Sequence, residues 1–170
     1  MTNLNNRIYN ELSDWKHAEC YLTEFSSVEK KKIKVLDIIL ISVSMVGIAG
    51  WFRFEDFKIF WTIVLVLAQI TRIAQKLFIT STEDLFNIKN SISFYSQNIL
   101  DLENLYYDYH NKKYSFKTIE SKLNILREKE RNLFGKQTFE KLKDIRELNL
   151  KAEQDTDIYL KKVINNISHG

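Results

Sequence analysis

The chain has 170 residues, 45% of them hydrophobic, and a formal net charge of +3. This length suits one domain, and the absence of proline favours long, uninterrupted helices. The single cysteine, Cys20, excludes an intrachain disulfide, and so small a net charge does not by itself indicate a nucleic-acid partner.

The first predicted element is an amphipathic cytoplasmic helix within residues 1–28. Its apolar side chains recur at helical spacing, at Ile8, Leu12, Trp15, Leu22 and Phe25. Ser26 and Glu29 fit a capping box, in which two side chains satisfy backbone N–H groups at the start of a helix. We therefore predict that a new helix starts at this point.

Residues 29–79 contain two apolar blocks, and we predict that they form a two-helix transmembrane hairpin. The blocks are VLDIILISVSMVGIAGWF, residues 35–52, and IFWTIVLVLAQITRIAQKLFI, residues 59–79. As helices they would measure roughly 27 and 31 Å, close to the thickness of a bilayer's hydrocarbon core. The segment between them, RFEDFK, predicts a short turn. A helical hairpin in the core of a soluble protein is the alternative.

The positions of the basic residues predict the orientation of this hairpin. Lys30, Lys31, Lys32 and Lys34 precede the first block, and Arg72 and Lys76 lie near the end of the second. The turn carries only Arg53 and Lys58. Lysine and arginine accumulate on the cytoplasmic side of membrane proteins, so we expect both termini in the cytoplasm.

Polar residues inside the two blocks share helix faces. Asp37 and Ser44 lie on one face of the first block, and Gln69, Arg72 and Lys76 lie on one face of the second. Ionisable residues at membrane depth are costly and usually face a partner or a water-filled path. Two interpretations stay open: an interhelical ion pair that fixes the hairpin, or the lining of a pore in an oligomer.

Residues 80–170 predict a cytoplasmic helical region that begins with a heptad repeat. Apolar residues recur in steps of three and four at Leu85, Ile88, Ile92, Tyr95, Ile99, Leu102, Tyr106 and Tyr109. A heptad needs a facing helix. We predict that the first six form the interface of a homo-oligomer, most readily a tetramer, aided by the small residues Ser44, Gly47 and Gly50. The second span either continues into this helix or is followed by a capping box from Thr80 to Glu83.

Two more helices are predicted after this one. Asn111 to Ser115 forms a turn, and the next helix carries Phe116, Ile119, Leu123, Leu126 and Leu133 on one stripe. Gly135 suits a helix C-terminus and Thr138 an N-cap. The last helix then runs through Leu142, Ile145, Tyr159 and Val163.

Charge differs between the two segments that follow the hairpin. Residues 83–108 hold five acids and one lysine, whereas residues 112–136 hold eight bases and three acids. One interpretation is that the two helices neutralise each other. The other is that the basic segment binds a polyanion, because phosphates need positive charge and bases need flat side chains on which to stack. The residues that would do so are Lys112, Lys113, Lys117, Lys122, Arg127, Arg131, Tyr106 and Tyr107, with Tyr114 nearby.

Catalytic and metal-binding patterns are absent from the sequence. His17, His110 and His169 are scattered, and four glycines do not make a phosphate-binding glycine-rich loop. We therefore expect neither enzymatic activity nor a cofactor or metal.

The layout resembles the SLATT family. The resemblance covers about residues 5–134 and rests on the order of ELSDWKHAECYL, EKKKIK, two closely spaced spans and a long helix. SLATT proteins are predicted membrane effectors of bacterial anti-phage systems, encoded beside nucleotidyltransferases. The resemblance implies an inner-membrane pore that a nucleotide or oligonucleotide signal controls, whose activity arrests or kills the infected cell. The alternative is a non-conducting, membrane-anchored scaffold that recruits a cytoplasmic partner.

Overall fold

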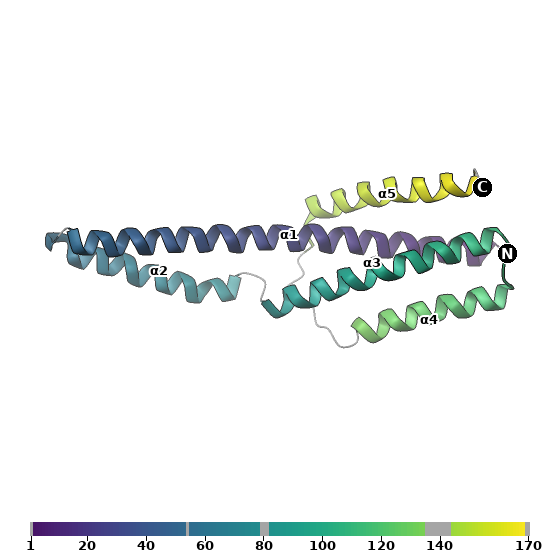
Figure 1. Cartoon of the computed structure of the whole chain (residues 1–170), viewed down its shortest axis with the longest axis horizontal. Coiled ribbons are helices and arrows are strands. Elements are labelled where there is room, and N and C mark those ends of the chain that lie inside the picture. Colours follow the sequence, from purple (N-terminus) through teal and green to yellow (C-terminus); the bar gives the residue numbers. More distant parts are fainter. Residues whose placement is uncertain (1, 54, 79–81, 135–143, 169–170) are drawn as a thin grey trace. The chain divides into compact units, whose positions relative to one another are not determined.

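The structure is a computed structural model that describes residues 2–53, 55–78, 82–134 and 144–168 (Figure 1). In chain order its elements are α1 (Thr2–Arg53), the short 3-10 helix η1 (Glu55–Phe57), α2 (Lys58–Phe78), α3 (Thr82–His110), α4 (Phe116–Phe134) and α5 (Arg146–Ser168). Every element in these ranges is helical, so the predicted all-α fold is confirmed.

The chain divides into two compact units. Unit 1 comprises Met1–Ser26 and Phe86–Gly170, and unit 2 comprises Ser27–Leu85. The predicted division was 1–28, 29–79 and 80–170. The structure instead joins the first and last segments of the chain in one unit, because their apolar faces form a common core.

The predicted helix start at Ser26 is wrong. Helix α1 continues without a break from Thr2 to Arg53, and the side chains of Ser26 and Glu29 are both buried along it. Glu29 accepts a hydrogen bond from Lys32 Nζ at 2.7 Å, one turn further on. A capping box satisfies N–H groups that lack a helical partner, and a helix that contains neither proline nor glycine before Gly47 exposes no such groups here.

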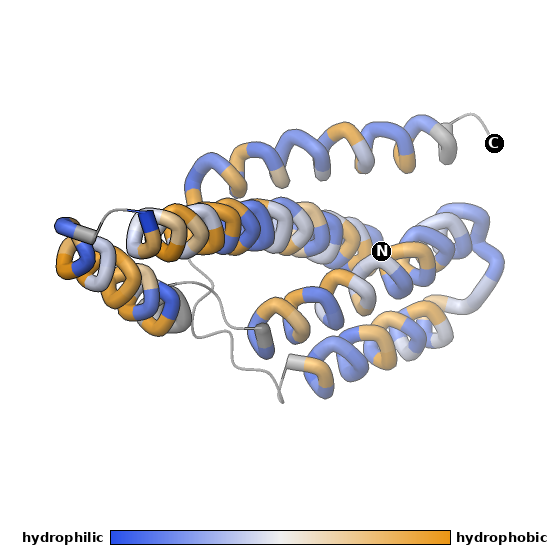
Figure 2. The backbone as a smooth tube through the Cα atoms, turned by 60° about the vertical axis from the view of Figure 1, so that its left-hand side comes forward, coloured by the Kyte–Doolittle hydropathy of each residue, from blue (hydrophilic) through white to orange (hydrophobic). Residues whose placement is uncertain are grey.

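The core of unit 1 is built from the apolar stripes of α1, α3, α4 and α5. Its fully buried side chains include Leu4, Ile8, Leu12, Ile88, Leu102, Ile119, Leu123 and Ala152. Trp15 of α1 packs against α3, with its ring centroid 5.6 Å from that of Phe94 and 5.9 Å from that of Tyr95. Colours alternate along α3, α4 and α5 in Figure 2, as expected for helices with one apolar face.

The heptad of α3 therefore finds its facing helix within the same chain. Ile88, Tyr95, Ile99 and Leu102 are buried in the core of unit 1, and Ile92 is partly buried against it. Leu85 is half-buried and belongs to unit 2. Four of the six residues predicted to form an oligomer interface are thus buried within the chain, in a core that includes Trp15 of α1.

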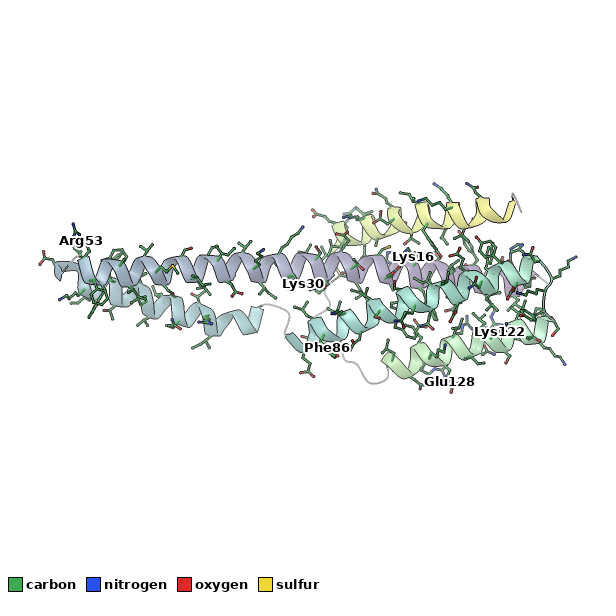
Figure 3. All side chains as sticks on the ribbon, viewed as in Figure 1. Lys16, Lys30, Arg53, Phe86, Lys122 and Glu128 are labelled. Atoms are coloured by element: carbon green, nitrogen blue, oxygen red, sulfur yellow. The ribbon has the colours of Figure 1, made fainter. Side chains whose placement is uncertain are left out.

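Helix α5 joins unit 1 through polar contacts around a small buried residue. Tyr159 Oη donates a hydrogen bond to Glu103 of α3 at 2.8 Å. Lys16 Nζ of α1, labelled in Figure 3, lies 4.8 Å from the centroid of the Tyr159 ring. Ala152 is fully buried, which allows α5 to approach closely. The predicted caps at Gly135 and Thr138, and Leu142, lie outside the described residues.

The predicted turn at Asn111–Ser115 is confirmed, since α3 ends at His110 and α4 begins at Phe116. The junction between α2 and α3 at residues 79–81 lies outside the described residues. Whether the second span continues into α3 therefore stays a prediction, as does the capping box from Thr80 to Glu83.

Unit 2 presents apolar side chains at its surface. Among the described residues, one helix is long and apolar enough to cross a membrane; it lies within Leu4–Arg53, and its most apolar window of 18 residues is only 11% buried. This is compatible with a location in a membrane. Helix α2 also exposes apolar side chains: Ile59, Phe60, Ile63 and Ile73 are all more than half exposed.

Candidate functional site

A polar recess in unit 2 brings together four of the five residues predicted inside the apolar blocks. Asp37 and Ser44 of α1 and Gln69 and Arg72 of α2 line one cavity of about 470 Å³. Its other walls are aliphatic or thioether side chains: Leu40, Ile41, Met45, Ile48 and Ala68. The side chain of the fifth residue, Lys76, lies outside the described ones.

Two glycines of α1 set how closely α2 approaches beside this recess. A Cβ atom at Gly50 would lie 2.3 Å from Trp61 Cε2, and one at Gly47 would lie 2.8 Å from Leu65 Cδ2. Close approach of helices favours small residues at the contact. The glycines predicted to help separate chains associate therefore serve contacts within one hairpin.

The recess combines opposite charges with hydroxyl and amide groups. Ser44 donates its hydroxyl proton to the carbonyl oxygen of Leu40 at 2.8 Å, so its oxygen stays available as an acceptor. Asp37 and Arg72 are both exposed side chains on the wall of the cavity. Around them lie more than half-exposed aliphatic residues such as Ile38, Val46 and Ile70. The result is a charged recess on an apolar surface.

The basic segment of α4 and its preceding turn is partly neutralised within unit 1. Lys113 Nζ lies 3.2 Å from Asp108 of α3, and this hydrogen-bonded pair raises the pKa of Lys113. Arg127 instead pairs with Glu11 of α1. Lys113 is therefore neutralised by the acidic helix, as one interpretation of the sequence predicted. The partner of Arg127 instead comes from the N-terminal part of the chain.

The remaining predicted polyanion-binding residues differ in accessibility. The side chains of Lys112, Lys117 and Arg131 are exposed. Lys122 Nζ lies 3.9 Å from the centroid of the Tyr114 ring. Tyr106 is 7% exposed, and burial raises its pKa. Because its ring packs in the core, Tyr106 does not offer a free face on which a base can stack. Tyr107 is half-buried against the same core.

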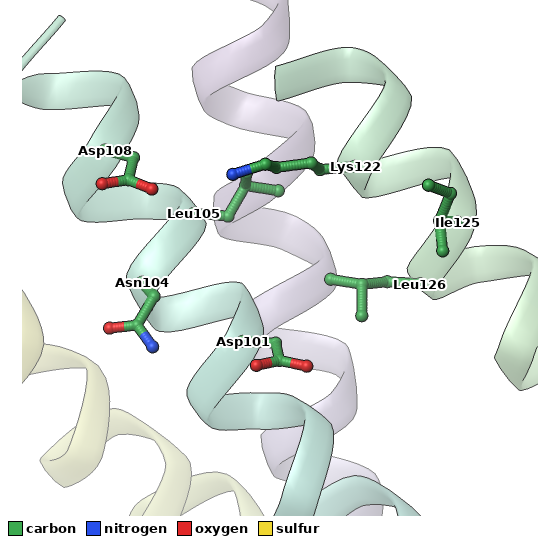
Figure 4. Close-up of a pocket in the computed structure, with 7 residues that line it drawn as sticks. All are labelled: Asp101, Asn104, Leu105, Asp108, Lys122, Ile125 and Leu126. Carbon is green, nitrogen blue, oxygen red and sulfur yellow. The ribbon is translucent and has the colours of Figure 1, made fainter. Parts of the chain in front are cut away.

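Two cavities lie between α3 and α4. The first has a volume of about 250 Å³ and is lined by Asp101, Asn104, Leu105, Asp108, Lys122, Ile125 and Leu126 (Figure 4). The second, at the turn, has a volume of about 320 Å³ and is lined by Tyr109, His110, Lys112, Tyr114, Phe116 and Ile119. Of its lining, Lys112 and Tyr114 are among the residues predicted from the sequence for polyanion binding. The rings at 109, 110 and 116 flank the predicted turn and the ring at 114 lies within it, and that clustering was the signal for this cavity.

A half-buried carboxylate joins α3 and α4 in unit 1. Tyr95 Oη of α3 donates a hydrogen bond to Glu130 Oε1 of α4 at 3.0 Å. Burial raises the pKa of Glu130; the negative charges of Glu11 and Asp14 on α1 act in the same direction, and the bond from Tyr95 opposes it. The period of the sequence did not single out this residue, because glutamate on a helix of this kind usually faces water.

Comparison with protein families, with curated proteins and with solved structures finds no match for this chain. Within the described ranges, no group of three or more histidine, cysteine, aspartate or glutamate side chains is arranged to hold a metal ion. The candidate sites are chosen on geometry alone: the polar recess of unit 2 and the cavity at the α3–α4 turn of unit 1.

Proposed function

We propose that this chain is the subunit of a homo-oligomeric membrane pore whose opening is controlled by a nucleotide or oligonucleotide. The observation that carries the proposal is the recess in which Asp37, Ser44, Gln69 and Arg72 meet on an otherwise apolar hairpin. Charged groups in a bilayer need water or partners. A water-filled path through an assembly meets this need at little cost in free energy.

The exposed aliphatic surface of unit 2 supports placement of the hairpin in the bilayer. Both apolar blocks then span the membrane, and the turn around Asp56 faces outward while both termini are cytoplasmic. The side chain of Arg53 lies at the end of α1 next to this turn (Figure 3). We place the protein in a bacterial inner membrane.

Oligomerisation follows from the size of the hairpin. Two helices cannot enclose a conduit, so several copies must present the recess to a common axis. We propose a tetramer. Because α1 covers the heptad stripe of α3 within the chain, contacts in the membrane rather than a coiled coil would hold the subunits together.

The biological role is proposed from the SLATT resemblance. A nucleotidyltransferase encoded nearby would make the signal on infection, and the open pore would dissipate ion gradients and arrest the cell. A non-conducting anchored scaffold is the second candidate, and the pairs Lys113–Asp108 and Arg127–Glu11 favour it because they reduce the charge available for a ligand.

Ion flux from sealed liposomes tests the proposal. We expect purified protein to release a fluorescent or ionic tracer, and Arg72→Gln to change the ratio of cation to anion flux because it removes a charge from the recess. The matched control is Arg53→Gln, which removes the same charge next to the turn. Absence of flux from wild-type protein at every ligand tested would favour the scaffold.

Cysteine labelling tests the topology. In a Cys20→Ser background, a cysteine at Asp56 should react with a membrane-impermeant maleimide added outside, and a cysteine at Lys112 should not. The reverse labelling pattern would refute the orientation.

A further inference from the structure

We propose that the cavity at the α3–α4 turn is the nucleotide site, and that it takes one small nucleotide rather than a long single strand. The inference rests on the proposed function, which it deepens by naming the site and the size of the ligand. The cavity has a volume of about 320 Å³, within the range of small-molecule sites. It lies wholly within unit 1, on residues 109–119.

The lining of the cavity suits a flat ring that carries an anion. Tyr109, His110, Tyr114 and Phe116 supply rings, Lys112 supplies a positive charge, and Ile119 supplies a buried aliphatic wall. Tyr114 is 40% and Phe116 47% exposed, so both rings have surface free for stacking. Aromatic surfaces stack on bases of any identity, and ammonium groups bind phosphate.

The backbone of the turn fixes these side chains in place. The N–H of Asn111 donates to the carbonyl oxygen of Tyr107 at 2.9 Å, and that of Lys113 donates to Asp108 at 3.0 Å. Lys112 adopts a φ of 52°, which is uncommon for a residue with a side chain. Ser115 Oγ then accepts the N–H of Thr118 at 3.3 Å and caps α4. A turn held by such bonds presents a largely preformed cavity.

The lining of this cavity includes Lys112 and no carboxylate, whereas its neighbour combines Lys122 with two carboxylates. Lys122 and Lys113 place their Nζ atoms 3.9 and 5.4 Å from the centroid of the Tyr114 ring. The neighbouring cavity in Figure 4 includes the carboxylates of Asp101 and Asp108. An anionic ligand is repelled by those carboxylates, so the turn is the favourable end of the α3–α4 groove.

The same charges limit the length of the ligand. A single strand that followed α4 from the turn would next meet the acidic cavity. Further along the helix, Arg127 is engaged by Glu11. Continuous binding of phosphates needs a continuous basic track. A ligand of one or two nucleotides needs only the turn.

Calorimetric titration of the full chain in detergent tests the site. The probes are ATP, inorganic tripolyphosphate, adenosine and a 15-residue oligothymidylate. We expect ATP to bind more tightly than either tripolyphosphate or adenosine, because it uses both the rings and the lysines. Phe116→Ala should weaken ATP binding by roughly 5- to 150-fold, the range for losing one stacked base. Phe116 is exposed, so the variant should fold.

A matched pair of lysine variants separates the cavity from general charge. Lys112→Ala should weaken ATP binding by at least about 5-fold, and Lys129→Ala, an equal change at an exposed position of α4 outside the cavity, should not. Equal effects of the two variants would overturn the inference. So would tripolyphosphate binding as tightly as ATP, or the oligothymidylate binding more tightly than ATP without dependence on Lys112.

The flux assay tests the pore and the calorimetric titration tests the nucleotide site, so the two proposals can be refuted separately. Conducting liposomes that contain protein unable to bind ATP would overturn this site and leave the pore standing. Binding of ATP that depends on Phe116 and Lys112, by protein that never conducts, would refute the pore and retain the site.

Discussion

Replacing Gly50 by alanine should weaken the contact between α1 and α2. The added Cβ would lie 2.3 Å from Trp61 Cε2 and 2.6 Å from Cδ2 and Cζ2. Ordinary contact between carbon atoms needs about 3.5 to 4.0 Å, so the indole or the helix must move by more than 1 Å. The fused ring cannot bend away, and overpacking of this kind costs about 1 to 3 kcal/mol.

Gly47→Ala is the matched control for this change. Both substitutions gain about 1 kcal/mol of helix propensity. At Gly47 the new Cβ would meet Leu65 Cδ2 at 2.8 Å, which is the end of a side chain that can change rotamer. We therefore expect Gly47→Ala to be neutral or stabilising and Gly50→Ala to reduce stability by up to about 2 kcal/mol net.

Unfolding of the detergent-solubilised protein by SDS, followed by tryptophan fluorescence, measures both variants. A second substitution, Trp61→Leu, should cancel most of the difference between them, because the clash is with the ring. Equal stabilities for Gly50→Ala and Gly47→Ala would refute the reasoning, as would a penalty at Gly50 that survives removal of Trp61.

Three further predictions concern unit 1. Leu102→Ala, at a fully buried position, should lower the free energy of unfolding, measured in urea, by about 2 to 5 kcal/mol. Leu100→Ala, at a position 59% exposed, should change it by less than about 1 kcal/mol. Similar losses for the two variants would contradict the assigned core. Glu130→Gln should be at least as stable as wild type at pH 8, but wild type should become the more stable of the two as pH falls towards 4. The reason is that a carboxyl whose pKa is raised in the folded state contributes stability that is lost as pH rises. A difference in urea midpoints that does not change with pH, or the same trend in Glu128→Gln, would contradict this. Tyr159→Phe should lower the free energy of unfolding by about 1 to 2 kcal/mol in the same assay and increase protease cleavage in α5, because it removes the hydroxyl that donates to Glu103 of α3. Unchanged values would show that this bond does not hold α5.

The polar recess could be predicted from the sequence because local geometry determines it. A short turn fixes the register of two antiparallel helices, and helical period then fixes which residues share a face. Asp37 and Arg72 therefore line one cavity, together with Ser44 and Gln69. None of these steps needs knowledge of a distant partner.

The partner of the α3 heptad could not be predicted in the same way. A repeat such as that from Ile88 to Leu102 demands a facing helix but does not say which one. The segment that covers it includes Ile8, Leu12 and Trp15, far away in the sequence, and a second copy of α3 satisfies the pattern equally well. Choice between them depends on tertiary packing, which the period of one helix does not contain.

Local signals also failed where neighbouring residues overrode them. Ser26 and Glu29 match a capping box, but the helix-forming residues on both sides keep α1 continuous. The rings of Tyr109, His110 and Phe116 belong to different parts of the helix–turn–helix pattern, and only the conformation of the turn, with Lys112 at positive φ, gathers them around one cavity.

The division of unit 1 between the two ends of the chain has a consequence for biosynthesis. Residues 1–26 leave the ribosome with their apolar face uncovered, and the second segment of the unit begins at Phe86, about 60 residues later. At typical rates of translation this interval is roughly 3 to 12 s. On the proposed topology the hairpin is made during that time, so membrane insertion precedes closure of the cytoplasmic bundle. A nascent chain halted before Phe86 should therefore carry Trp15 exposed and accessible to chaperones.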